Sequence, residues 1–144
     1  MTSNATNALF DVNFWVALVL THHTHNVPAV AALPALPAPV FCRVTQSGLL
    51  RMLTTAPVMG ANTCDAAMAW SVYEKIARAT RATFLNEPAG LERQWKEFMI
   101  AGGSTAGNAW TDAYLAAFAV SAGLEMVTFD RGFRRFKDLH CRIL

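Results

Sequence analysis

Short apolar segments alternate along this chain with longer segments in which apolar residues recur at helical spacing. The apolar segments are residues 9–12, 39–42, 84–85, 125–129 and 141–144. The helical segments are residues 13–21, 29–36, 44–54, 64–83, 91–100 and 111–122. Strands that alternate with helices pair in parallel, and the helices cover the two faces of the sheet. The sequence therefore predicts an α/β fold with a mostly parallel central sheet.

The length of 144 residues is that of one ordinary domain, and the sequence shows no internal repeat and no domain-sized linker. We expect a single domain over residues 1–144. Residues 1–7 are small and polar, so we expect them to form a loose N-terminal tail.

Hydrophobic residues make up 53% of the chain, which raises the question of a membrane. The apolar stretch 8–20 is too short to span a bilayer and contains Asp11. Prolines interrupt the stretch 27–41, and no Lys or Arg precedes Arg43, as a secretory signal would require. We expect a cytoplasmic protein that does not enter membranes and whose surplus apolar surface meets a partner chain.

Three aspartates lie at positions that the predicted topology would bring to one edge of the sheet. Asp11 and Asp130 lie at the carboxyl ends of predicted strands, and Asp112 opens a helix whose apolar stripe faces the sheet. Ligand sites of parallel sheets lie at the carboxyl ends of the strands, so the three carboxylates are expected to converge. Their mutual repulsion would be relieved by a divalent cation, and all-oxygen ligands favour Mg²⁺ or Mn²⁺. Such a site polarises a phosphodiester and activates a water for in-line attack.

Taken singly, two of these acids have a structural interpretation. Thr111 is the expected N-cap, and the neighbouring Asp112 could have no role beyond a favourable interaction with the helix dipole. Asp130, which precedes Arg131 and Gly132, could have no role beyond stabilising a turn. Only their joint placement with Asp11 favours a metal site.

Four motifs, in order, resemble those of PIN-domain ribonucleases, especially the VapC-type toxins of type II toxin–antitoxin pairs. They are residues 9–13, 42–51, 111–117 and 127–133. The resemblance implies a three-layer α/β/α sandwich and divalent-metal-dependent endoribonuclease activity. It also implies a frequent homodimer and a small antitoxin protein that covers the groove.

By position, the resemblance assigns the metal ligands to Asp11, Asp112 and Asp130. It marks Asn13 and Thr128 as supports of the site through hydrogen bonds. The chain departs from the family pattern at Gln46, where such proteins usually carry Glu. Gln46 shares a helical face with apolar residues, so we expect it to point toward the same site. Its amide can ligate a metal or orient a water, but it carries no charge and cannot act as a base.

A basic cluster follows the last aspartate: Arg131, Arg134, Arg135 and Lys137. We expect it to hold the RNA backbone, since neutralised phosphates supply most sequence-independent affinity. The alternative is an ordinary solvated face. Arg51 is a further candidate, as a partner of an active-site acid or of an antitoxin carboxylate.

Two other groups have structural interpretations. His22, His23 and His25 lack the i, i+4 pairing of helical zinc sites, so we expect a loop that ends a helix. Several aromatic and apolar residues are expected in the core, with a dimer or antitoxin surface as the alternative. They are Trp15, Val16, Trp70 and Tyr73.

Three functions compete on these observations. The first is a metal-dependent endoribonuclease toxin. The second is a PIN-like binding module that has lost catalysis, which Gln46 favours. The third is a receiver-type phosphoryl acceptor, which is disfavoured because adjacent acids are missing early in the chain.

Overall fold

The computed structural model describes residues 6–144 and contains a five-stranded sheet in which all neighbouring strands run parallel. In chain order the strands are β1 (Asn7–Phe10), β2 (Ala38–Phe41), β3 (Thr83–Phe84), β4 (Glu125–Thr128) and β5 (Cys141–Ile143). Their order across the sheet is β3-β2-β1-β4-β5, so β1 lies at the centre with β4 directly beside it. The predicted parallel α/β sheet is confirmed.

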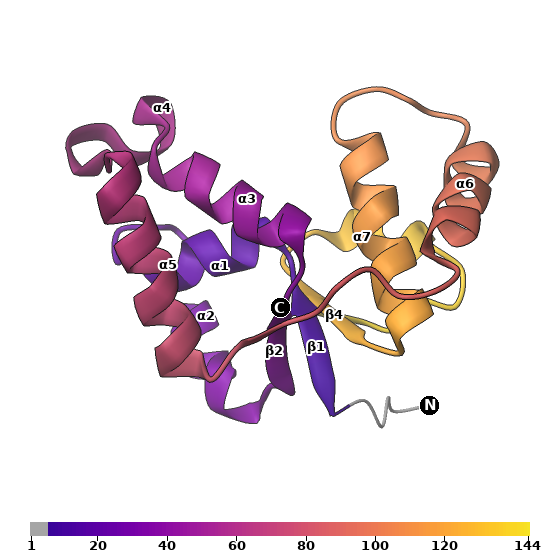
Figure 1. Cartoon of the computed structure of the whole chain (residues 1–144), viewed down its shortest axis with the longest axis horizontal. Coiled ribbons are helices and arrows are strands. Elements are labelled where there is room, and N and C mark those ends of the chain that lie inside the picture. Colours follow the sequence, from indigo (N-terminus) through magenta and orange to yellow (C-terminus); the bar gives the residue numbers. More distant parts are fainter. Residues whose placement is uncertain (1–5) are drawn as a thin grey trace.

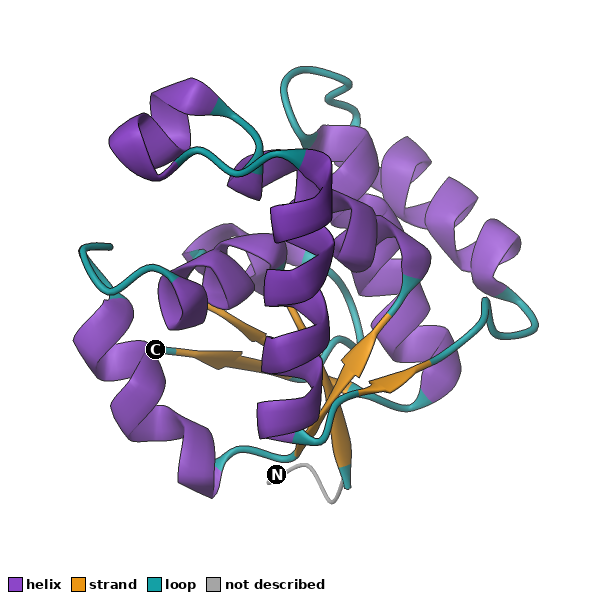
Figure 2. Ribbon diagram, turned by 60° about the vertical axis from the view of Figure 1, so that its left-hand side comes forward, coloured by secondary structure: helices purple, strands orange, loops and turns teal. Residues whose placement is uncertain are grey.

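Helices cover both faces of the sheet and give the three-layer α/β/α sandwich that the sequence predicted (Figures 1 and 2). The α-helices are α1 (Val12–Val19), α2 (Asn26–Ala32), α3 (Arg43–Leu53), α4 (Ala56–Met59), α5 (Ala66–Thr80), α6 (Leu91–Gly102) and α7 (Ala109–Ala122). Short 3₁₀ turns are η1 (Leu33–Ala35), η2 (Gly60–Asn62) and η3 (Arg131–Arg135). The first five α-helices lie on one side of the sheet in Figure 1, and α6 and α7 lie on the other. No helix in the described part of the chain is long and apolar enough to cross a membrane.

The core divides into two halves because strand side chains alternate between the two faces. Leu9 of β1 packs with the residues of α6 and α7, whereas its neighbour Phe10 packs with those of α1 and α3. On the second side Trp15 stacks on Phe41 with ring centroids 4.1 Å apart. Burial on both faces explains why the central strands are apolar without interruption.

The structure corrects three element boundaries. The expected tail lies mostly outside the described residues, but Asn7 pairs with Ala38 as the first residue of β1. The expected helix 29–36 is instead α2 followed by the 3₁₀ turn η1, because the ring of Pro34 cannot continue an α-helix. Thr111 was wrongly predicted to be an N-cap: α7 begins at Ala109, after Asn108.

Candidate active site

Asp11 lies at the junction of β1 and α1, at the carboxyl edge of the sheet. Its backbone N–H donates to the carbonyl of Val127 in β4 at 3.0 Å, and its own carbonyl accepts from Phe14 and Trp15 in α1. The residue is only 7% exposed. The backbone of Asp11 is thus anchored to both β4 and α1.

The hydroxyl of Thr128 links two of the aspartates. It donates to Oδ2 of Asp11 at 2.9 Å and accepts from the backbone N–H of Asp130 at 2.9 Å. Thr128 is fully buried at the end of β4, beside β1. Of the two residues predicted to support the site, Thr128 therefore contacts an acid directly.

Asp112 and Asp130 approach from other elements. Asp112 lies in the first turn of α7, and its Oδ2 is 3.7 Å from Nη2 of Arg135. Asp130 is exposed just after β4 and accepts a hydrogen bond from the backbone N–H of Gly132 at 2.8 Å.

The three carboxylates are close enough to act on one another. Burial raises the pKa of Asp11 to about 6, against the lowering effect of the Thr128 hydrogen bond, and the charges of Asp112 and Asp130 raise it further. Burial also raises the pKa of Asp112, where Arg135 opposes the shift and Asp130 adds to it. The fold thus gathers the predicted acids into one electrostatically coupled group.

The donor chemistry of this group suits a hard divalent cation. A buried carboxylate whose ionised form is penalised by desolvation and by two like charges gains from a nearby cation. As the side chains lie, however, no three His, Cys, Asp or Glu side chains within residues 6–144 come close enough to hold one ion. Arg135 is the cation that Asp112 contacts in this arrangement. Binding of Mg²⁺ or Mn²⁺ stays a prediction.

Gln46 has other surroundings than the sequence suggested, and the supporting role of Asn13 stays a prediction. Gln46 is buried on α3, and its Oε1 accepts a hydrogen bond of 2.6 Å from Arg43, whose guanidinium lies over the ring of Phe84. Within residues 6–144, Gln46 forms no hydrogen bond with the aspartates. Asn13 is exposed in the first turn of α1. The spacing of three residues between Arg43 and Gln46 is a local signal that could have indicated their pairing.

A glycine brings α3 against the start of α1. A Cβ placed on Gly48 would lie 2.6 Å from Cγ2 of Val12, the residue that follows Asp11. Only a residue without a side chain permits this close approach. Gly48 therefore helps to hold the segment that carries Asp11.

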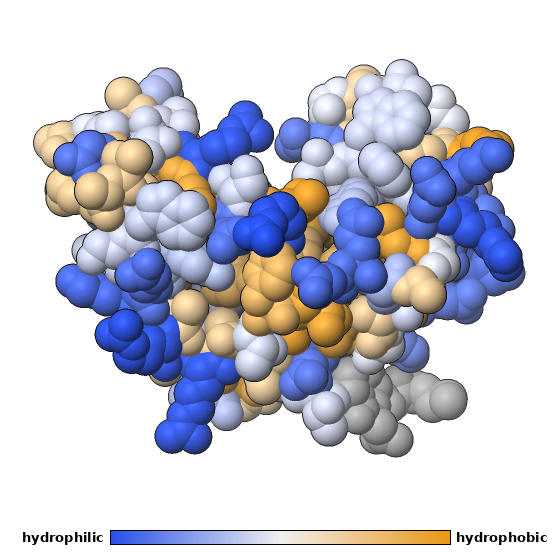
Figure 3. Space-filling model, viewed as in Figure 1, coloured by the Kyte–Doolittle hydropathy of each residue, from blue (hydrophilic) through white to orange (hydrophobic). Residues whose placement is uncertain are grey.

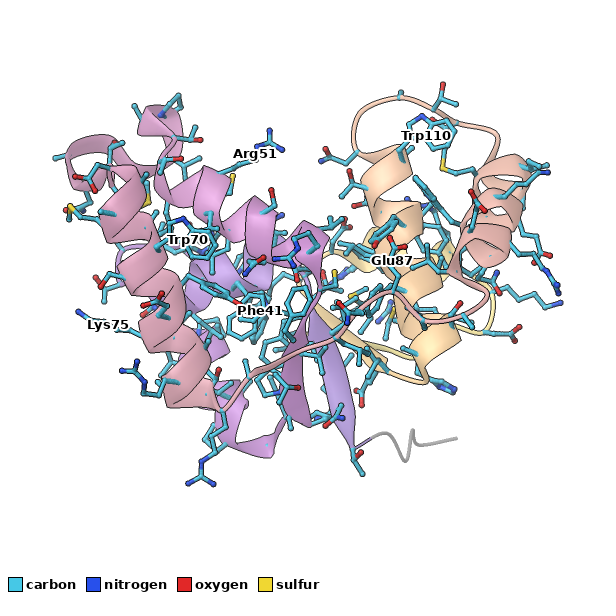
Figure 4. All side chains as sticks on the ribbon, viewed as in Figure 1. Phe41, Arg51, Trp70, Lys75, Glu87 and Trp110 are labelled. Carbon is cyan, nitrogen blue, oxygen red and sulfur yellow. The ribbon has the colours of Figure 1, made fainter. Side chains whose placement is uncertain are left out.

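The predicted basic cluster is exposed along η3 and just beyond it, next to Asp130. Figure 3 shows a notch between the two lobes of the molecule, with hydrophilic side chains on both sides. Arg51 points from α3 toward this notch, and Trp110 lies across from it at the start of α7 (Figure 4). Strand β1 runs from the N-terminal side toward the base of the notch (Figure 1).

Most of the remaining sequence candidates have structural roles. His23 Nδ1 accepts a hydrogen bond from the backbone N–H of His25, whose ring stacks on Phe129 with centroids 4.4 Å apart. The histidines form the loop between α1 and α2, as predicted. Trp15 and Val16 are core residues, whereas Trp70 is 46% exposed between α5 and α3 (Figure 4).

Comparisons with known proteins agree with the motifs and the fold. The PIN domain family model matches residues 8–139. Ribonuclease VapC41 of Mycobacterium tuberculosis (strain CDC 1551 / Oshkosh) is 40% identical over 143 residues, which cover 94% of this chain and 97% of the relative.

Two solved structures show the same fold. VapBC2 from Rickettsia felis, bound to a DNA fragment from its promoter, superposes with a TM-score of 0.69 at 14% identity, covering 95% of this chain and 98% of that chain. VapC20 of Mycobacterium tuberculosis, a toxin that cleaves the sarcin-ricin loop, superposes with a TM-score of 0.63 at 17% identity, covering 88% and 92%. Because the PIN domain family model matches most of the chain, the receiver-type interpretation is set aside. The chain belongs to the PIN-domain family, among its VapC-type ribonucleases.

Proposed function

We propose that this protein is a divalent-metal-dependent endoribonuclease and the toxin of a toxin–antitoxin pair. The observation that carries the proposal is the coupled group of Asp11, Asp112 and Asp130 at the carboxyl edge of β1 and β4. The 40% identity to a ribonuclease over nearly the whole chain supports RNA as the substrate.

The three aspartates would hold Mg²⁺ or Mn²⁺, which would polarise the scissile phosphodiester and activate a water for in-line attack. Thr128 orients the carboxylate of Asp11 through its hydroxyl, and the same hydroxyl fixes the backbone of Asp130. Burial of Asp11 keeps competing water away from its carboxylate. The acid group thus has one rigid member and two members nearer the solvent.

Basic side chains beside the acids would bind the RNA backbone. Arg131, Arg134 and Lys137 are exposed and form no salt bridge within residues 6–144. Their charges are therefore free for phosphates, and neutralised phosphates supply affinity that does not depend on sequence. Arg51, which points toward the notch, would meet the same strand from the opposite lobe.

An antitoxin is the proposed protein partner. A shallow groove of about 410 Å³ lies between α3 and α5, with Trp70 and Leu50 in its apolar lining and Arg43 and Arg51 at its edge. Exposed apolar and cationic side chains together suit an amphipathic, acidic segment. The VapBC complex from Rickettsia felis provides a structural precedent for a partner protein.

A homodimer, expected from the family resemblance, also belongs to the proposal. Val27 and Val30, three residues apart on α2, are each more than half exposed, and neighbouring exposed apolar side chains are commonly covered in an assembly. Sedimentation equilibrium of the purified protein would test for the dimer.

Cleavage of purified RNAs tests the enzymatic proposal. We expect the wild-type protein to cut RNA in the presence of Mg²⁺ or Mn²⁺ and to lose activity with EDTA, Asp11→Asn or Asp112→Asn. Asp138→Asn is the matched control, because Asp138 is exposed in a left-handed turn that Asn adopts readily. Wild-type protein that leaves ribosomal and transfer RNAs intact with either metal would refute the proposal.

The alternative of an inactive PIN-fold binding module rests on Gln46 alone. The comparisons do not favour it, and Gln46 is engaged with Arg43 instead of the acids. The variant Gln46→Glu separates the ribonuclease from the inactive module. RNA cleavage by the variant but not by the wild type would support the inactive module. Equal cleavage by both proteins would exclude it.

A further inference from the structure

A pocket of about 590 Å³ opens beside Asp112, between the start of α7 and the end of η3. Its buried wall is apolar and is formed by Phe98, Met99 and Phe136, each less than a tenth exposed. A pocket of this size, with an apolar wall and a few polar groups, is typical of small-ligand sites. Neither the proposed metal site nor the binding of the RNA backbone by the basic cluster gives this cavity a function.

Arg135 forms a flat cationic surface in the lining of the pocket. Its guanidinium stacks on Phe136 at 4.2 Å, its Nη1 donates to the carbonyl of Gly132 at 2.7 Å, and its Nη2 lies 3.7 Å from Asp112. The side chain is nevertheless 46% exposed, so these contacts fix the guanidinium without covering it. A Cβ on Gly132 would lie 3.0 Å from the same guanidinium, which shows how closely the backbone fits it. Planar guanidinium groups are surfaces on which unpaired bases stack.

Polar groups in the lining suit the other parts of a nucleotide. The side chain of Asn108 caps nothing in α7 and is exposed, so its amide can offer a donor and an acceptor to the edge of a base. Lys137 also lines the pocket and carries a charge suited to a phosphate. Asp112 lies in the same lining, which places the ligand next to the proposed point of cleavage.

We infer that this pocket takes one unpaired nucleotide of the RNA, adjacent to the cut phosphodiester, and selects it by its base. The inference rests on the proposed ribonuclease function and deepens it by assigning the position at which sequence is read. The base stacks on Arg135 against the apolar wall, Asn108 reads its edge, and Lys137 contacts its phosphate.

Binding of single nucleotides tests the pocket without any cleavage. The four ribonucleoside 5′-monophosphates and inorganic phosphate are titrated one at a time, in EDTA, into ¹⁵N-labelled protein. We expect resonances of Asn108 and Phe136 to shift with the nucleotides and affinity to differ among the four bases. Ala106→Trp, which fills the pocket from its exposed loop, should weaken the binding roughly tenfold or more. Ala61→Trp, an exposed alanine away from the pocket, is the control and should leave it unchanged.

Three results would decide against the pocket. Equal shifts with inorganic phosphate, nucleotide binding that Ala106→Trp does not weaken, or no shift at Asn108 would overturn the inference. Asn108→Ala should reduce the difference among the four bases, and an undiminished difference would exclude the amide as the reader. If the nucleotides bind as expected but no RNA is cleaved, the proposed function fails and the pocket stands.

Discussion

Replacing the buried Asp11 with asparagine should stabilise the metal-free protein near neutral pH. In the native state the pKa of Asp11 rises from 3.8 to about 6, with burial as the largest cause. At about 1.4 kcal/mol for each tenfold change in proton affinity, the ionised carboxylate costs the native state about 3 kcal/mol at pH 7. Asparagine removes the charge and keeps an oxygen that can accept from Thr128.

The sign follows from which state holds the proton more tightly. Because the native pKa is the higher one, the native state binds a proton that the unfolded state releases between about pH 4 and pH 6. The contribution of Asp11 to stability is therefore complete below about pH 4 and is lost as the pH rises through about 6. The raised pKa of Asp112 acts in the same direction.

Urea denaturation in EDTA at pH 5 and pH 7.5 measures the effect. We expect Asp11→Asn to raise the free energy of unfolding at pH 7.5 by up to about 3 kcal/mol, a midpoint shift of roughly 1–2 M urea, and to flatten the pH dependence. Asp138→Asn should change neither quantity. A variant that is less stable than wild type at pH 7.5, with the pH dependence intact, would refute the electrostatic account of this site.

Three further variants test the parts around the acids. Thr128→Val removes the hydroxyl that donates to Asp11, so the pKa of Asp11 should rise and the acidic limb of the pH–rate profile should move to higher pH, whereas Thr128→Ser should keep the wild-type profile. Gly48→Ala puts a methyl group against α1 and should lower the free energy of unfolding by about 1–3 kcal/mol in urea titrations. Gly102→Ala, where nothing lies within 4 Å, should not lower it, and equal losses in both would contradict this view. Arg134→Gln should reduce the salt slope of RNA binding by about 1, and an unchanged slope would show that Arg134 neutralises no phosphate.

The sheet and the position of two acids were predictable because they depend on local pattern and general topology. Apolar segments buried on both faces identify central strands, and parallel strands place their carboxyl ends at one edge. Asp11 and Asp130 followed from that rule. The same rule does not predict that β4 lies beside β1. The hydrogen bond from Thr128 to Asp11 depends on this adjacency.

The contacts that tune the site could not be predicted because they join distant segments. Arg135 reaches Asp112 only through the packing of η3 against the start of α7, so sequence suggested an RNA contact alone. The pocket behind it is formed by α6, α7 and η3 together and has no sequence signature. Gln46 was assigned by its helical face, but its neighbour Arg43 takes its carbonyl oxygen.

Binding of Mn²⁺ to purified protein, followed by the loss of the free-ion electron paramagnetic resonance signal, tests the gathering of the three aspartates most directly. We predict a single class of bound ion in the wild-type protein and in Asp138→Asn. Binding should weaken by at least roughly tenfold in each of Asp11→Asn, Asp112→Asn and Asp130→Asn. Equal Mn²⁺ binding in all of these proteins, or none in the wild type, would contradict the account.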